Sequence, residues 1–369
     1  MPVSSPAHTD ALPASRSLRR DPSRLDPVVD RLRERVRSGA LPAVALAIGD
    51  ADGHIRSETF TTDGRGLSRD SLFFLASVTK PIVATSFMQL LDDGLLGLDD
   101  PVARYIPGFA NAPDKERVTL RHLLTHTSGV PDYTPEMIRQ NRPSAAAMTK
   151  FGIESALLFT PGTRYEYCSV SFYLLMRIIE TLTGLEHANH LRIGLLEPLG
   201  MRATYDPRGS GRPIVAVRGV GVDNRLKRFL ILRYLAATQI PGGGLFGTLD
   251  DLLLFGAALL RPREINGREV PLSGRTVDLM FEDHLGGLPG MYDDEELSVH
   301  FGLGWGKPTL MFDLPGSPRV VSHGGATGTR LWIDPEAELV FVFFTNQWSP
   351  DRGPETEALR GTYASMDLA

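Results

Sequence analysis

The stretch FFLASVTKPIVATSFMQLL, residues 73–91, passes from a short run of large apolar residues into a long apolar segment. The apolar segment predicts a helix from Ser77 to Leu91 that ends at Gly94. Ser77 and Lys80 are three residues apart, so on a helix they share one face. The stretch therefore places a hydroxyl and an amine together at the start of an apolar helix.

A serine hydroxyl is a weak nucleophile and needs a nearby base. Lys80 can be that base, because burial in an apolar helix disfavours its charged form and lowers its pKa. The free N–H groups and the dipole at a helix N-terminus suit a developing oxyanion. Ser-x-x-Lys is nevertheless a short motif, and taken alone it is more often an N-cap serine followed by a surface lysine.

Two later segments carry groups that fit the same chemistry. In residues 161–169, PGTRYEYCS, a Pro-Gly turn leads to Tyr167, whose phenol can share a proton beside Ser77. In residues 322–328, SHGGATG, glycines on a predicted strand edge leave room for a substrate, and backbone N–H groups can face a carbonyl oxygen. Each segment alone also fits a simpler interpretation: a core tyrosine, and a Gly-rich hairpin with an incidental His323.

Strand-like runs lie at both ends of the chain, with helical patterns between them. Strands are predicted at 43–48, 54–62, 302–306, 319–322, 329–333 and 339–344. Further helices are predicted at 26–36, 120–124, 171–182 and 248–260. We therefore predict an α+β fold, in which one antiparallel sheet built from both chain ends is flanked by helices and carries an inserted, mostly helical region.

The predicted domain organisation follows from this pattern. Residues 1–24 are rich in Pro, Ser, Ala and Arg, and we expect a mobile N-terminal extension there. Residues 25–369 are expected to form one domain, with an α/β part at about 25–76 plus 240–369 and a helical part at about 77–239. A cleft between two such parts is a common place for an active site.

Composition narrows the class of protein. The chain has 369 residues, a formal net charge of −5 and a single cysteine, Cys168, so no internal disulfide can form. The mild negative charge argues against a nucleic-acid partner, and no run of about 18 apolar residues predicts a membrane span. The N-terminus has no apolar stretch long enough for a signal peptide, so we expect a cytoplasmic protein.

In their order and context, the three segments resemble the branch of serine β-lactamase-like enzymes that contains class C β-lactamases, family VIII carboxylesterases and DD-peptidases. Related penicillin-interacting enzymes follow Ser-x-x-Lys with Ser-Asp-Asn and Lys-Thr-Gly; in this branch Tyr-x-Asn takes the middle place. The resemblance covers about residues 26 to 346 and includes LDDPV at 98–102, LLTHTSG at 123–129, PLGM at 198–201, GGGL at 242–245 and GLGW at 302–305.

The resemblance implies that Ser77 attacks a carbonyl carbon to form an acyl-enzyme, which water then hydrolyses. Lys80 and Tyr167 would share the proton transfers, and the backbone N–H groups of Ser77 and Ala326 would form the oxyanion hole. The implied substrate-binding residues are Ser169, His323, Gly324 and Gly325. The family gives no reason to expect a metal or a cofactor.

Two positions depart from the family pattern. Ser169 stands where Asn is usual, and a hydroxyl is shorter and has one donor, which puts its contacts to Lys80 and to a substrate amide in doubt. His323 stands where β-lactamases and peptidases have Lys, and a mostly neutral imidazole attracts a substrate carboxylate less than an ammonium does. Both changes weaken the case for a β-lactam or peptidoglycan substrate.

Other motifs are set aside or left open. His122 and His126 have the spacing of metal ligands, but no carboxylate partner is evident, so we expect structural roles. No serine lies in a Gly-x-Ser-x-Gly elbow, so an α/β-hydrolase is not supported. The basic and apolar segment 225–234 fits a lid, an oligomer contact or a plain surface helix.

Three functions fit this sequence. The first is a carboxylesterase that acts on small esters, with or without acyl transfer. The second is a β-lactamase or a D-amino-acid peptidase, which would act on amides. The third is a non-catalytic acyl-binding or penicillin-sensing protein. In each case the partner is a small ester or amide molecule.

Overall fold

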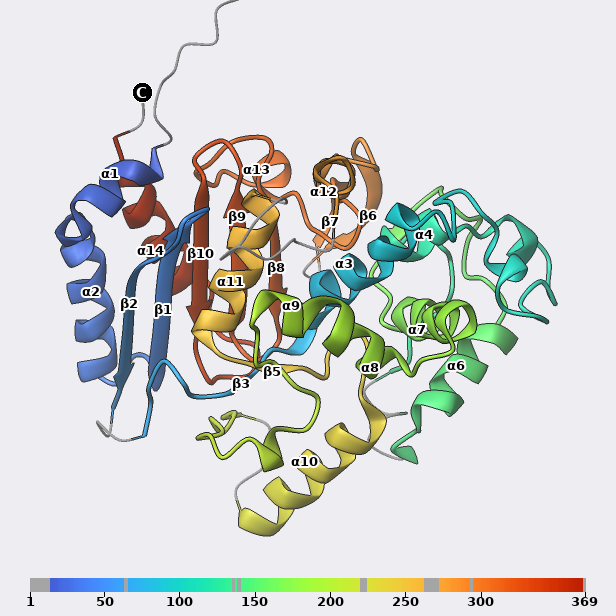
Figure 1. Ribbon diagram of the computed structural model, residues 1–369, viewed down its shortest axis with the longest axis horizontal. Coiled ribbons are helices and arrows are strands. Elements are labelled where there is room, and N and C mark those ends of the chain that lie inside the picture. Colours follow the sequence, from blue (N-terminus) through green and yellow to red (C-terminus); the bar gives the residue numbers. More distant parts are fainter. Residues whose placement is uncertain are drawn as a thin grey trace, which may run out of the picture.

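The computed structural model describes residues 14–62, 66–134, 137, 141–219, 224–261, 272–292 and 295–367 (Figure 1). The two ends of the chain meet in one five-stranded antiparallel sheet, which has the order β2 (Gly53–Thr61), β1 (Ala43–Asp50), β10 (Leu339–Phe344), β9 (Thr329–Asp334) and β8 (Val321–Gly325). β1 pairs with β10 so that Ala45 lies opposite Phe344. The predicted α+β fold is confirmed.

The central strands are apolar along their whole length because both faces of the sheet are covered. In β10, Leu339 and Phe341 pack with one cluster, and Val340 and Val342 pack with the other. The first cluster joins the sheet to α2 (Asp26–Arg37) and α14 (Gly353–Ala364). The second joins it to α11 (Leu249–Leu260) and to the helical part of the molecule (Figure 1). Burial on both faces removes the polar alternation of a half-exposed strand.

The prediction of a mobile extension over residues 1–24 is wrong for the part that the structure describes. Helix α1 (Ser15–Arg20) packs on the sheet, with Leu18 fully buried among apolar side chains. The Arg19 guanidinium forms an ion pair with the Asp50 carboxylate at the end of β1. One buried leucine and one ion pair fix a segment whose composition resembles that of a flexible tail. Residues 1–13 lie outside the described residues.

The predicted strand at 302–306 is also wrong. Phe301 and Gly306 form only an isolated bridge, and Gly304 has a φ of 81°, which turns the chain. A Cβ at Gly304 would lie 2.6 Å from the Ala84 Cβ, so this turn packs tightly against helix α3 (Thr79–Asp92). Glycine here allows close approach to a helix and does not continue the sheet.

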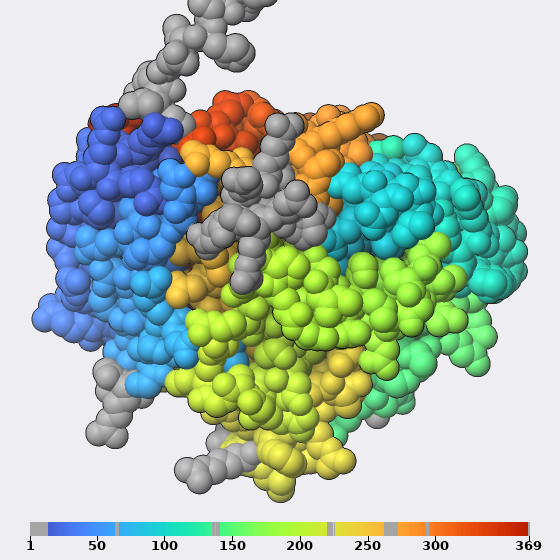
Figure 2. Space-filling model, in the orientation of Figure 1, coloured from blue at the N-terminus to red at the C-terminus, as the bar shows by residue number. Residues whose placement is uncertain are grey.

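The helical part lies beside the sheet, and α10 forms one margin of the molecule (Figure 2). Its helices are α4 (Leu120–Leu124), α6 (Ala145–Glu154), α7 (Val170–Thr183), α8 (His187–Leu191), α9 (Glu197–Leu199), α10 (Arg225–Thr238) and the π-helix η5 (Arg192–Leu196). Nearer the sheet are α12 (Gly274–Phe281), α13 (Pro308–Met311), and the small strands β3 (Phe73–Phe74), β4 (Tyr165–Glu166), β5 (Phe246–Gly247), β6 (Leu288–Tyr292) and β7 (Glu295–Val299).

Single-turn 3₁₀ helices connect these elements: η1 (Pro22–Leu25), η2 (Ala76–Val78), η3 (Val102–Arg104), η4 (Lys115–Arg117) and η6 (Pro207–Gly209). Within the described ranges, no helix has both the length and the apolar character needed to cross a membrane.

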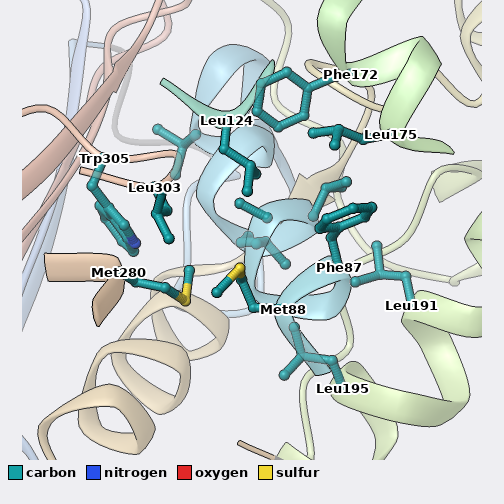
Figure 3. Packing of buried hydrophobic residues seen from close by; sticks show 14 of the residues in the cluster. Phe87, Met88, Leu124, Phe172, Leu175, Leu191, Leu195, Met280, Leu303 and Trp305 are labelled. Atoms are coloured by element: carbon teal, nitrogen blue, oxygen red, sulfur yellow. The ribbon is translucent and has the colours of Figure 1, made fainter. Parts of the chain in front are cut away.

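Helix α3 is the central element of the molecule. Every residue from Thr79 to Leu90 is buried. Figure 3 shows Phe87 and Met88 of this helix among side chains from several surrounding elements, which include Phe172, Leu175, Leu191, Leu195, Met280, Leu303 and Trp305. A helix that is apolar all round is stable only inside a protein, so any group at its start is held rigidly.

We predict that Gly256→Ala destabilises the protein. Alanine normally favours a helix over glycine by about 1 kcal/mol, but a Cβ at Gly256 would lie 2.5 Å from Val340 Cγ1 on the sheet. We expect overpacking to lower the free energy of unfolding by about 1–3 kcal/mol in urea denaturation. Gly209→Ala is the control, because nothing lies within 4 Å of its added Cβ. A more stable Gly256→Ala protein would contradict the close contact between α11 and β10.

Candidate active site

Ser77 lies in η2, directly before α3, and is partly exposed between two buried neighbours, Ala76 and Val78. Ala76 has a φ of 47°, a left-handed conformation that is rare for a residue with a side chain. The preceding carbonyl, Leu75 O, accepts a hydrogen bond of 2.8 Å from Thr329 Oγ1 of β9. The sharp backbone turn at Ala76 therefore presents Ser77 at the junction of sheet and helix. The first residue of β9 holds the Leu75 carbonyl before this turn.

Lys80 is almost completely buried, with 1% of its surface exposed. Its Nζ donates to Gly242 O at 2.8 Å and to Ser169 Oγ at 3.3 Å, and it lies 4.6 Å from the centre of the Tyr167 ring. The structure thus brings together groups from three distant parts of the chain. The Ser169 hydroxyl reaches Lys80 despite being shorter than asparagine, so this contact survives the substitution.

Burial lowers the pKa of Lys80 from its usual value to about 8, and the nearby Asp132 carboxylate partly opposes that shift. A neutral amine is therefore accessible near neutral pH. Neutral Nζ has a free lone pair that can accept a proton, whereas an ammonium has none. This property suits a base for a serine hydroxyl.

Tyr167 follows strand β4 and lies between two imidazoles. Its ring centre is 4.5 Å from that of His126 and 6.3 Å from that of His323. The close, tilted contact with the His126 ring restricts the orientation of the phenol next to Lys80. Tyr167 is therefore a rigidly held side chain within the same cluster as Lys80.

Two residues outside the predicted site, Asp132 and His126, support this cluster. Asp132 accepts hydrogen bonds from the backbone N–H groups of Ser169 at 2.8 Å and Tyr133 at 2.9 Å. His126 Nδ1 accepts from Cys168 N at 3.1 Å, and His126 has a φ of 58°. His126 lies in the stretch LLTHTSG and Asp132 lies three residues after it, and the polar residues Thr125–Ser128 of this stretch are buried.

His323 on β8 is 8% exposed and its Nδ1 lies 2.9 Å from Gly324 O. A carbonyl oxygen only accepts, so Nδ1 carries the hydrogen and Nε2 is left as an acceptor. Burial lowers the pKa of His323 to about 3, and the positive charge of Lys80 adds to this effect. The imidazole is therefore neutral at physiological pH.

The two glycines after His323 are needed for packing within the protein. A Cβ at Gly325 would lie 2.4 Å from Leu75 O, and one at Gly324 would lie 3.0 Å from the Arg330 Cζ. Their missing side chains thus let β8 approach η2 and Arg330. In the structure, protein atoms fill the space that side chains at these two positions would need, and the close approach of a substrate to their backbone stays a prediction.

Ala326 begins the turn between β8 and β9, on the side of η2. Its carbonyl accepts from Ser349 N at 2.7 Å, and Gly328 N donates to Gly325 O at 3.0 Å across the turn. The two bonds fix the orientation of the Ala326 peptide. A fixed N–H group is what an oxyanion hole requires.

Other candidate groups have structural roles. His122 Nδ1 accepts from Thr119 N at 3.2 Å as part of a helix capping box, so His122 and His126 each use one ring nitrogen on the backbone. Cys168 is buried, and burial raises the pKa of its thiol to about 12. A protonated, buried thiol is a poor nucleophile.

Comparison with known proteins agrees with this architecture. The profile of the family described as Beta-lactamase matches residues 28–364, so the chain belongs to the beta-lactamase family of serine hydrolases. It is 28% identical over 305 residues to Penicillin-binding protein 4* of Bacillus subtilis (strain 168), a match that covers 76% of this chain and only 62% of that protein.

A second relative is Esterase EstB of Burkholderia gladioli, 31% identical over 271 residues, covering 63% of this chain and 68% of the esterase. Among solved structures, a penicillin-binding protein homologue from Caulobacter crescentus superposes with a TM-score of 0.77 at 20% identity, covering 93% of this chain and 98% of that one. At this identity the likeness shows the fold alone.

We predict that kcat/KM for a neutral ester rises with pH and levels off above about 8. If neutral Lys80 is the base, its active form accumulates as pH rises, because its pKa is lowered to about 8. His323 does not contribute to this titration, because its pKa is about 3. Initial rates between about pH 6 and pH 10 check the profile. A flat profile, or one that falls through this range, contradicts the role of Lys80.

Proposed function

We propose that the protein is a carboxylesterase that hydrolyses small, neutral esters through an acyl-enzyme on Ser77. Ser77 Oγ attacks the ester carbonyl carbon, and its proton passes to Lys80 Nζ with the help of Tyr167. The N–H groups of Ser77 and Ala326 stabilise the oxyanion. The bond to the alcohol oxygen breaks as that oxygen takes the proton, and water then attacks the acyl-serine by the same route to release the acid.

The uncharged His323 is the observation that favours an ester. β-Lactams and peptidoglycan stem peptides carry a free carboxylate, and simple esters do not. A neutral imidazole with an acceptor at Nε2 offers such a carboxylate no charge. A charge-assisted hydrogen bond is roughly twice as strong as a neutral one, a difference of about 1–2 kcal/mol.

The guanidinium that lies beside Gly324 is already part of an ion pair. The Arg330 guanidinium lies beside Gly324, but it forms an ion pair with the Glu355 carboxylate, whose side chain is only 10% exposed. Arg352 forms a second ion pair with the same carboxylate, at 3.0 Å. Arg330 is therefore paired within the protein, and one carboxylate balances one of the two guanidinium charges, so the positive charge next to Gly324 is reduced.

Mutation should distinguish the nucleophile Ser77 from the two proton carriers, Lys80 and Tyr167. We expect Ser77→Ala to abolish labelling by a fluorophosphonate probe, because the probe reacts with an activated serine. Lys80→Ala and Tyr167→Phe should each lower kcat by about a hundredfold or more, and the double variant should lose little further, since the two act as a unit. Intact-mass spectrometry and steady-state rates measure these effects.

The exposed Ser38→Ala variant is the matched control, and thermal unfolding checks that each variant folds. Labelling that persists in Ser77→Ala would assign the nucleophile to another serine. Stoichiometric acylation without turnover would instead identify an acyl-binding sensor.

We expect His323→Lys to shift specificity toward substrates with a carboxylate. The new ammonium would add a charge-assisted contact, so the ratio of kcat/KM for a carboxylate-bearing ester to that for its neutral methyl ester should rise about tenfold. The wild-type protein should prefer the neutral ester at about pH 8, where an ordinary histidine is uncharged. If the wild type already prefers carboxylate substrates, chromogenic cephalosporins or D-Ala-D-Ala peptides at this pH, the peptidase or β-lactamase interpretation replaces the ester.

A further inference from the structure

A cavity of about 210 Å³ lies between α10 and the small β3–β5 sheet. Its walls include Phe74 and Phe246 from the small sheet, Leu232 and Leu235 from α10, and Trp348 from the loop after β10. The α10 helix closes one side of the cavity and forms a margin of the molecule (Figure 2). Ile231 and Trp348, which are 41% and 45% exposed, mark where it opens to solvent.

Three residues that line the cavity are close in the chain to the proposed oxyanion hole or to the residue that holds it. Thr327, which lines it, follows Ala326 directly and donates its hydroxyl to Phe74 O. Trp348 precedes Ser349, whose N–H holds the Ala326 carbonyl at 2.7 Å. Phe74 itself is only three residues before Ser77. A group bound in the cavity would therefore contact residues that closely precede or follow the proposed oxyanion hole in the chain.

The chemistry of the walls selects an apolar ligand. Two of the polar side chains that line the cavity are already engaged with the backbone: Thr327 donates to Phe74 O, and Arg228 donates to Ile214 O. The remaining walls are mostly aliphatic and aromatic. An apolar cavity of about 150 Å³ is large enough to bind benzene, so this one is large enough for a short or branched hydrocarbon chain.

The arrangement of the proton-transfer groups indicates which half of the ester would occupy it. Lys80, Tyr167 and Ser169 do not line the cavity. The leaving alcohol must take a proton from these groups, so it has to lie on their side of Ser77. The other substituent of the carbonyl carbon is then directed away from them. We propose that this cavity binds the apolar acyl chain of the ester; the assignment rests on the proposed esterase function.

Two variants with opposite effects on cavity size test the proposal. Val217→Phe should narrow the cavity and Leu232→Ala should widen it, since both residues line it. We compare kcat/KM for p-nitrophenyl hexanoate with kcat/KM for p-nitrophenyl acetate. In Val217→Phe we expect the ratio of hexanoate to acetate to fall about tenfold, because about two methylene groups of the longer chain would lose their apolar contact. In Leu232→Ala the preferred acyl chain should become longer.

Leu226→Ala is the matched control, because Leu226 is on the same helix but 67% exposed and outside the cavity wall. Its acyl-chain preference should equal that of the wild type. A second series varies the alcohol and keeps an acetyl group. If the cavity variants change alcohol preference instead, or change neither preference while esters are still hydrolysed, the acyl-chain assignment is wrong.

Tryptophan fluorescence in Ser77→Ala gives a readout that does not need turnover. Trp305 and Trp332 are 0% and 2% exposed, so Trp348 is the tryptophan whose surroundings a ligand in the cavity would change. Ethyl hexanoate should shift the emission to shorter wavelength, ethyl acetate should do so only weakly, and Trp348→Phe should remove the shift. A shift without ester hydrolysis by the wild type would refute the esterase function and retain the cavity as an apolar binding site. No shift would show that the cavity does not bind the ester.

Discussion

The buried amine of Lys80 is the constraint on which the rest of the site depends. An ammonium removed from water is costly unless polar groups replace the lost hydration. Here the replacements are the Gly242 carbonyl, the Ser169 hydroxyl and the face of the Tyr167 ring. Each comes from outside α3, so the amine can be buried only when the loop after α10 and the start of α7 are in place. The partial compensation leaves its pKa near 8, where proton transfer is easy in both directions.

The arrangement around Lys80 also depends on two glycines and on one strained backbone conformation. A Cβ at Gly242 would lie 3.2 Å from Lys80 Nζ, so the loop can bring its carbonyl to the amine because residue 242 lacks a side chain. On the other side of η2, Gly325 permits β8 to pack against Leu75 O. The left-handed conformation of Ala76 is held between these contacts. A strained residue of this kind persists only where the surrounding packing determines it.

The charges of His323 and Arg330 distinguish this site from a site that binds a substrate carboxylate. His323 is neutral because it is buried beside Lys80, and Arg330 forms an ion pair with Glu355. Next to the same turn, the protein has an apolar cavity roofed by α10. A neutral His323 and an apolar cavity are consistent with the same choice of substrate, an ester whose recognition depends on shape and hydrophobic contact. The relatives include both an esterase and a penicillin-binding protein, so fold alone does not decide between these substrates.

Local sequence predicted many of the elements, and β10 was predicted with its observed ends. Ser77, Lys80 and Tyr167 were selected from the order of their three segments along the chain and from the family resemblance which that order carries. Tertiary structure decided what depends on distant contacts. The burial of Leu18 orders a segment with the composition of a tail, and the turn at Gly304 packs on α3 where a strand was expected. Asp132 and His126 act through backbone groups about forty residues away. The neutrality of His323 and the cavity beneath α10 likewise arise from burial and enclosure, which only the folded chain creates.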